Sequence, residues 1–141
     1  MEKKIVQVQE RTQQLIRQLL NVWESSVRAT HDFLSEEEII KIREYVPMAI
    51  ENVEYLIIAE KEFGEPVAFM GIDSNRLEML FLSPEVRGKG LGKQLLQYGI
   101  ETYNIQELTV NEQNPQAVGF YFRPIKERIS MSREIRIRFC I

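Results

Sequence analysis

The chain has 141 residues, 44% of them hydrophobic, and this size predicts one domain, residues 1–141, with a single packed core. A formal net charge of −3 excludes a nucleic-acid-binding protein held by bulk positive charge, and the lone Cys140 excludes a disulfide framework and a cysteine-based metal cluster. Neither a signal peptide nor an apolar run near the roughly 20 residues that span a bilayer is visible, so we expect a cytoplasmic protein without membrane partners.

The first third of the chain predicts a short strand followed by two helices. Residues 3–9 have the composition of a strand, and from Thr12 the spacing of apolar residues becomes that of an amphipathic helix, with Leu15, Ile16, Leu19, Leu20, Val22, Trp23 and Val27 on one face. Ser35 and Glu38 form a capping box for a second helix. This helix is expected to run to about Val46 because Pro47 should end or disturb it.

The centre of the chain predicts strands joined by tight turns. Residues 53–60 and 67–72 read as a hairpin, and residues 76–82 as a third strand that leads into a glycine-rich loop. A helix over about 90–103 and a strand over 107–110 follow, and a crossover helix of this kind favours parallel neighbouring strands. The fold class is therefore α/β, with a mixed, mainly antiparallel sheet flanked by helices.

The glycine-rich loop is the most informative stretch. An apolar strand ends at Pro84, and Gly88, Gly90 and Gly92 then alternate with the basic residues Arg87, Lys89 and Lys93. Glycines let the backbone approach a ligand closely, and the first-turn N–H groups of the following helix favour a phosphate. We interpret the loop as a pyrophosphate cradle.

Spacing separates the known kinds of phosphate loop. A nucleotide P-loop needs four residues before its Gly-Lys and then Ser or Thr, whereas three residues separate Gly88 from Gly92, and Gln94 follows Lys93. The alternating glycines also fit a dinucleotide fingerprint poorly. The remaining pattern is Arg-x-x-Gly-x-Gly, filled by Arg87, Gly90 and Gly92.

This pattern, placed after Leu80-x-Leu82-x-Pro84, resembles that of the GNAT superfamily of acetyl-coenzyme A-dependent N-acetyltransferases. Residues 114–121 are similar to the family's Asn-x-x-Ala-x-x-Phe-Tyr helix, and the resemblance extends from the two N-terminal helices through Tyr121. More narrowly, residues 23–34 and 111–114 resemble a small bacterial branch, one member of which is a peptidyl-lysine N-acetyltransferase.

The resemblance implies roles for individual residues. Backbone groups of Leu80 and Leu82 would pair with the pantetheine arm of coenzyme A, and Asn114 would hydrogen-bond near it. Tyr121 would act as general acid for the departing thiolate. The pyrophosphate and its surroundings would be held by the loop residues Arg87, Gly88, Lys89, Gly90, Leu91, Gly92 and Lys93.

The implied reaction is direct attack of a neutral primary amine on the thioester of acetyl-CoA in a ternary complex, which needs a base and a polarising N–H. Glu78, on the strand that enters the loop, is the candidate base, and His31 is a second candidate at the substrate site. The acceptor, a protein lysine or a small-molecule amine, stays open, as does the choice between monomer and homodimer. The alternative function is a non-catalytic acetyl-CoA-binding sensor or partner module. No metal site is predicted.

The resemblance stops after Tyr121, so residues 122–141 are atypical of the family. Pro124 would break the expected helix early, and residues 133–141 alternate apolar and polar side chains as a strand does. In a shifted frame, codons that encode residues 128–141 can also spell a phrase similar to the usual C-terminus of the branch. One hypothesis is therefore a frameshift near residues 122–125, which sequencing of the gene tests.

Overall fold

The computed structural model describes residues 4–30, 34–111, 127–131 and 134–138, with backbone alone for residues 109–111 and for the last two segments. The elements, in chain order, are β1 (Lys4–Gln7), α1 (Gln13–Thr30), α2 (Glu36–Asn52), β2 (Tyr55–Glu60), β3 (Pro66–Asp73), β4 (Arg76–Leu82), α3 (Leu91–Tyr103), β5 (Glu107–Asn111), β6 (Glu127–Met131) and β7 (Glu134–Arg138). Short 3₁₀ turns lie at Glu62–Gly64 and Pro84–Val86. None of the helices in these segments is long and apolar enough to cross a membrane.

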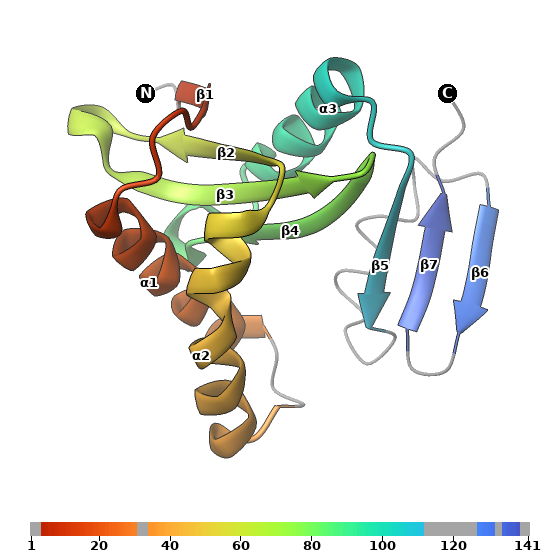
Figure 1. Ribbon diagram of the computed structural model, residues 1–141, viewed down its shortest axis with the longest axis horizontal. Coiled ribbons are helices and arrows are strands. Elements are labelled where there is room, and N and C mark those ends of the chain that lie inside the picture. The colour runs from red at the N-terminus through yellow and green to blue at the C-terminus, as the bar shows by residue number, and fades with distance from the viewer. Residues whose placement is uncertain (1–3, 31–33, 112–126, 132–133, 139–141) are drawn as a thin grey trace.

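The strands form one seven-stranded sheet in the order β1-β2-β3-β4-β5-β7-β6 (Figure 1). Neighbours are antiparallel except β4 and β5, which are parallel because α3 carries the chain back across the sheet between them. The prediction of a mixed, mainly antiparallel sheet flanked by helices is confirmed.

Helices cover both faces of the sheet, and each face has its own apolar core. On one face, α1 and α2 contribute Leu19, Trp23 and Ile50, which pack with Leu56 and Phe69 of the sheet. On the other face, α3 packs against a second cluster that includes Leu95, Leu96, Met70, Ile105 and Leu108. Figure 1 shows α1 and α2 on one side of β2–β4 and α3 behind them.

The expected end of the second helix at Pro47 is wrong, because α2 continues through Pro47 to Asn52. Proline removes one backbone donor, but the turn that follows buries Ile50 completely in the core. Arg11 also donates hydrogen bonds to the carbonyl oxygens of Ile50 and Glu51, at 3.0 and 2.9 Å. A cation at the helix C-terminus satisfies carbonyls that would otherwise lack partners.

The predicted start of α2 is confirmed in detail. The Ser35 hydroxyl accepts a hydrogen bond from the Glu38 N–H, and the Glu38 carboxylate accepts one from the Ser35 N–H, as a capping box requires. The first turn also carries Glu36 and Glu37, which favour the positive end of the helix dipole.

The strand expected within residues 133–141 is present as β7, which inserts between β5 and β6. The strand β6 has no counterpart in the sequence-based expectation. Its residues, Glu127–Met131, show no strict alternation, so pairing with β7 rather than local pattern defines it. The region around Pro124 lies outside the described residues.

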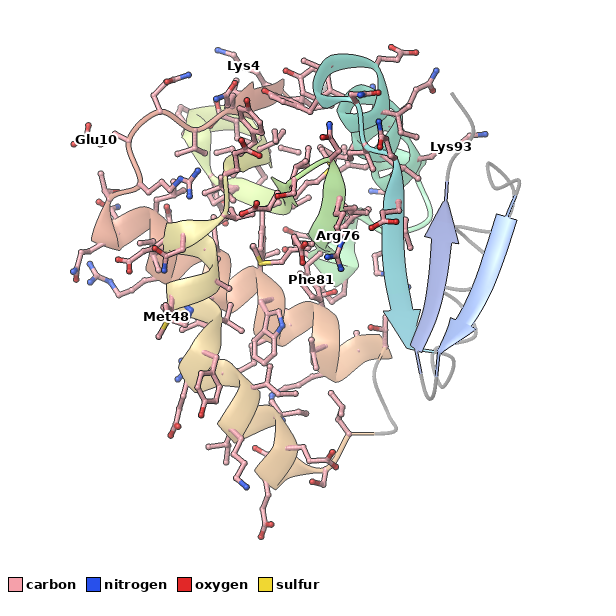
Figure 2. All side chains as sticks on the ribbon, turned by 45° about the vertical axis from the view of Figure 1, so that its right-hand side comes forward. Lys4, Glu10, Met48, Arg76, Phe81 and Lys93 are labelled. Atoms are coloured by element: carbon pink, nitrogen blue, oxygen red, sulfur yellow. The ribbon has the colours of Figure 1, made fainter. Side chains whose placement is uncertain are left out.

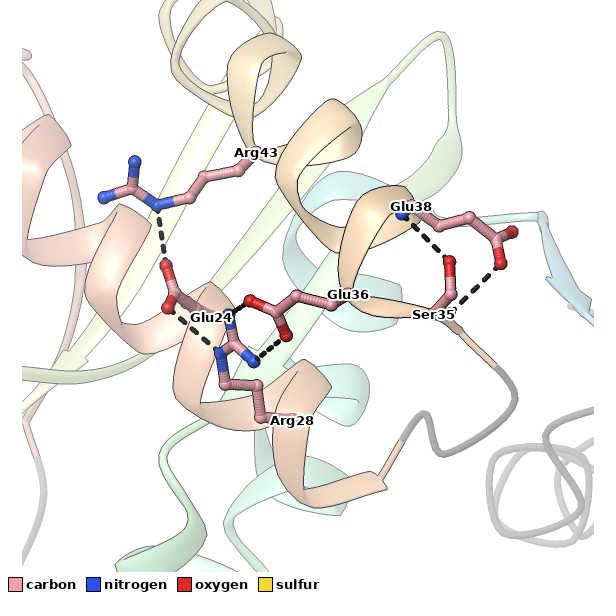
Figure 3. A network of polar contacts seen from close by, with 6 residues as sticks. All are labelled: Glu24, Arg28, Ser35, Glu36, Glu38 and Arg43. Carbon is pink, nitrogen blue, oxygen red and sulfur yellow. Dashed lines mark hydrogen bonds and ion pairs between the residues drawn. The ribbon is translucent and has the colours of Figure 1, made fainter.

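A network of ion pairs joins α1 to α2 (Figure 3). Arg28 binds Glu24 of its own helix at 3.1 Å and Glu36 of α2 at 2.7 Å, while Arg43 of α2 reaches back to Glu24 at 2.6 Å. The hydrogen bond from Arg28, followed by that from Arg43, lowers the pKa of the Glu24 carboxyl, and Arg28 lowers that of Glu36. All four side chains are partly exposed, so the network is a modest, salt-sensitive link.

The lowered pKa of Glu24 predicts an acid-sensitive contribution to stability. A carboxyl whose pKa is lower in the folded chain stabilises it above the ordinary value of 4.5, and this stabilisation is lost as pH falls through the lowered value. We expect Glu24→Gln to be less stable than wild type near pH 7 and to show a shallower loss on acidification. Urea unfolding between pH 7 and pH 3 measures both effects, and Glu37→Gln, outside the network, should keep the wild-type slope.

Candidate functional site

The sheet opens between its two parallel strands. Pairing of β4 with β5 is confined to Arg76 with Glu107 and Leu77 with Leu108, after which the strands diverge (Figure 1). Beyond Leu77, β4 pairs with β3 on one side only, while β5 continues along β7. Within the described residues, the other edge of β4 over residues 78–82 therefore presents backbone N–H and C=O groups that no strand takes up. Such an edge can pair with an extended ligand.

A β-bulge at Glu78 lies just above the closed end of this opening. Leu77 pairs with Ile72 of β3 and Met79 with Gly71, so Glu78 is the extra residue on β4. The bulge changes which face each side chain takes: Leu77 and Leu80 join the α3 side of the core, and Met79 joins the α1 and α2 side. Glu78 is left exposed, on the strand that borders the opening.

Ion pairs of Arg76 close the base of the opening. Its Nε lies 3.3 Å from Oε1 of Glu107 on β5, across the first parallel pair, and 3.7 Å from Oε1 of Glu78. Figure 2 shows Arg76 between β4 and β5. One guanidinium therefore contacts the neighbouring strand and the bulge carboxylate together.

The glycine loop follows β4 at the wide end of the opening. Gly88 and Gly90 have φ angles of +76° and +83°, which side chains of L-residues rarely adopt. A Cβ atom on either residue would meet nothing within 4 Å, so these glycines are needed for backbone conformation rather than for close packing within the chain.

The first turn of α3 has free donors beside basic side chains. Gly90 is its N-cap and has no side chain to accept a hydrogen bond, and the Gln94 N–H donates to the Gly90 carbonyl oxygen at 3.0 Å as the helix begins. The first-turn N–H groups at residues 91–93 thus have no acceptor within the helix. Lys89 and Lys93 are exposed at the same place, so backbone donors, helix dipole and side-chain charge favour an anion together.

The structure thus brings most of the predicted site residues to one side of β4. Leu80 and Leu82 lie on its open edge strand, and Glu78 lies between them and the base. The loop and first helical turn place Arg87, Gly88, Lys89, Gly90, Leu91, Gly92 and Lys93 together at its end. His31, Asn114 and Tyr121 lie outside the described residues.

A separate shallow hollow of about 170 Å³ lies where α1 meets the start of β3. Its carboxylates, Glu65 and Glu85, are 3.4 and 3.6 Å from the Lys61 ammonium, so both already have a cationic partner within the chain. Among the described residues, no group of three or more His, Cys, Asp or Glu side chains could hold a metal ion. The opening beside β4 is therefore the stronger candidate site.

Sequence reasoning missed Arg76 and Glu107 as partners. The two residues are 31 positions apart, and only the parallel register of β4 and β5 makes them neighbours. A weak signal was present in the sequence: Arg76 and Glu107, which have opposite charges, are the first residues of the two strands that the predicted crossover helix joins.

Comparison with known proteins finds a matching acetyltransferase family and related acetyltransferases. The family model for the acetyltransferase (GNAT) domain matches residues 12–124. A peptidyl-lysine N-acetyltransferase, YjaB, of Salmonella typhimurium is 40% identical over 103 residues, which cover 73% of this chain and 70% of the relative. Its Escherichia coli counterpart is 38% identical over 104 residues, 74% of this chain and 70% of the relative.

Solved structures show the same fold. The apo form of Escherichia coli YjaB aligns with a TM-score of 0.79 and 30% identity over 97% of this chain and 95% of the other. A protein from Pyrococcus horikoshii aligns equally well, with a TM-score of 0.79, although identity is 18% over 99% of this chain and 100% of the other.

Proposed function

Because the chain belongs to the GNAT acetyltransferase family and is therefore an acetyl-CoA-dependent acetyltransferase, we propose that it acetylates lysine side chains of proteins through the opening beside β4. One observation carries the placement of the site: the unpaired edge of β4 runs directly into a glycine loop and the uncapped end of α3. Coenzyme A, in which an extended arm is joined to a pyrophosphate, matches this order of strand edge, loop and helix terminus.

Binding would use backbone groups at the edge and charge at the loop. In the proposal, Leu80 and Leu82 pair through their backbone with the pantetheine arm, as an added strand would. Arg87 and Lys89, with the first-turn N–H groups of α3, hold the pyrophosphate. Positive φ at Gly88 and Gly90 gives the loop the tight turn from which these groups would reach the pyrophosphate.

Glu78 is the proposed general base. Acetyl-CoA supplies an activated thioester, and the acceptor nitrogen must lose a proton as it bonds to the acetyl carbon and the carbon–sulfur bond breaks. Glu78 lies at the bulge, exposed toward solvent, with Arg76 3.7 Å away to orient its carboxylate. A backbone N–H at the bulge, released from the β3 ladder, would polarise the thioester carbonyl.

Three further roles rest on the sequence motifs, since the residues lie outside the described segments. Tyr121 is proposed to give its phenolic proton to the departing thiolate sulfur. Asn114 is proposed to hydrogen-bond to the pantetheine arm, and His31 to contact the acceptor.

The choice of a protein lysine is tested by comparing acceptors. We expect acetyl-CoA-dependent acetylation of lysine-containing peptides, detected by mass spectrometry, to exceed that of polyamines and aminoglycosides in kcat/KM. The relatives named peptidyl-lysine N-acetyltransferases support this order. Faster turnover of a polyamine or an aminoglycoside would contradict the proposed acceptor while leaving the acetyltransferase assignment in place.

The role of the loop predicts the effect of Gly88→Ala. A residue with a Cβ in the left-handed region is strained by about 1–2 kcal/mol, so the loop should leave its conformation and weaken coenzyme A binding by about tenfold. Isothermal titration with coenzyme A measures this change.

Gly64→Ala is the matched control. Gly64 also has φ of +76°, and a Cβ there would meet only Glu60 Oε2 at 3.8 Å, an ordinary contact, but it lies in the turn between β2 and β3. Gly64→Ala should lower stability in urea unfolding by about as much as Gly88→Ala does, and it should leave coenzyme A affinity unchanged. Equal affinity in Gly88→Ala and wild type would show that the loop does not hold the pyrophosphate.

The proposed chemistry predicts that Glu78→Gln and Tyr121→Phe reduce kcat and spare coenzyme A affinity. Loss of a positioned acid or base typically costs about 10²–10⁴-fold. Glu78→Gln should also flatten the acid limb of the kcat/KM pH profile, whereas Tyr121→Phe should not. Glu62→Gln, an exposed glutamate in the β2–β3 turn, is the control. A wild-type pH profile in Glu78→Gln would show that another group acts as the general base.

A further inference from the structure

Exposed apolar side chains gather on α2. In the described part of the chain, four large hydrophobic residues of this helix are exposed: Ile40 by 51%, Ile42 by 40%, Tyr45 by 67% and Met48 by 59%. Folding does not require them, because the core face of α2 is supplied by other residues, Ile39, Val46 and Ile50. A gathered set of exposed apolar groups marks a contact surface more often than scattered ones do.

Helix geometry places these residues around the exposed side of α2. Ile42, Tyr45 and Met48 are three positions apart, so they form a slanted row, and Ile40 lies on the opposite flank from Ile42, about 80° beyond Met48. Figure 2 shows Met48 pointing away from the sheet and away from the opening beside β4. The surface is therefore separate from the site of acetyl transfer.

A line of carboxylates runs beside the apolar residues. Glu37, Glu44 and Glu51 are seven positions apart, nearly two full turns, so they share one side of the helix. Their carboxylates make no ion pair or hydrogen bond with the described residues. By contrast, Glu36 and Arg43 are engaged with α1, as Figure 3 shows. The charge on this side is thus available to a partner. Lys41 is the one basic residue of α2 outside the ion-pair network with α1.

We propose that this α2 face, formed by Ile40, Ile42, Tyr45, Met48, Glu37, Glu44 and Glu51, docks a basic, amphipathic segment of the acceptor protein. The inference rests on the proposed function, since a protein that offers lysines supplies the complementary charge. A second copy of this chain fits less well. A symmetric contact would bring the carboxylate lines of two α2 helices together, and like charges disfavour that pairing.

The docking surface has separable parts. Tyr45 and Met48 are the most exposed apolar groups and would anchor the segment, because large apolar and aromatic side chains carry most contact energy. The three carboxylates would speed encounter and make it sensitive to salt. Acceptors with a basic amphipathic segment should therefore be preferred over short peptides that carry one lysine.

The test uses two probes: a fluorescent amphipathic peptide of lysines and leucines, and a short peptide with one lysine among glycines and serines. Two variants alter the α2 face, Tyr45→Ser with Met48→Ser, and Glu37→Gln with Glu44→Gln and Glu51→Gln. The changed side chains are exposed or lie on the exposed side of α2, so the fold should tolerate them. Phe63→Ser, at an exposed aromatic in the β2–β3 turn, is the matched control.

We expect each α2 variant to weaken binding of the amphipathic peptide, measured by fluorescence anisotropy, by about tenfold and to raise its KM accordingly. Acetylation of the short peptide and coenzyme A affinity should stay at wild-type values, and Phe63→Ser should change neither probe. The carboxylate variant should also remove most of the salt dependence of peptide binding.

Two results overturn the proposal. Unchanged binding of the amphipathic peptide in both α2 variants removes the docking role. A wild-type dimer that becomes a monomer in these variants, measured by analytical ultracentrifugation, assigns the face to a second copy. Failure of the proposed function is seen separately, as absence of acetylation of the short peptide by the wild-type chain.

Discussion

The short parallel pairing of β4 with β5 is the constraint on which the rest of the molecule depends. Two residue pairs hold the strands together, and the ion pair between Arg76 and Glu107 lies on the first of them. Beyond this base, β3 holds β4 and β7 holds β5, so the strands are drawn to different neighbours and separate. The separation leaves a strand edge open inside a sheet, where water or a ligand must satisfy its backbone groups.

The position of α3 follows from the same pairing. A parallel connection requires a crossover, and the crossover begins at the end of β4, so the uncapped helix terminus lies at the end of the open edge. The bulge at Glu78 then places a carboxylate between the base and the edge. Strand edge, carboxylate and glycine loop therefore belong to one continuous stretch of chain.

The charged residues of the two N-terminal helices fall into two sets with different partners. Glu24, Arg28, Glu36 and Arg43 satisfy one another and tie α1 to α2. Of the remaining glutamates of α2, Glu38 completes the capping box, whereas Glu37, Glu44 and Glu51 lie outward beside exposed apolar groups and their carboxylates make no ion pair with the described residues. Composition alone does not separate these two sets, because both consist of exposed charged residues on amphipathic helices. Their partners in the folded chain distinguish them.

Local sequence was enough to predict the capping box at Ser35, the strand that ends at Leu82 and the glycine-rich turn that leads into a helix, because each depends on residues a few positions apart. It was not enough for the path of α2 through Pro47, which depends on burial of Ile50 and on Arg11, 39 residues away. The contact of Arg76 with Glu107 likewise depends on the parallel register of two strands that are distant in the sequence, and the bulge at Glu78 and the strand β6 depend on pairing with a neighbouring strand rather than on local pattern. The sequence by itself therefore determined most of the elements and the glycine-rich turn between β4 and α3. The tertiary structure decided which edge stays open and which charges face it, because strand register is set by packing against neighbours that local residues do not specify.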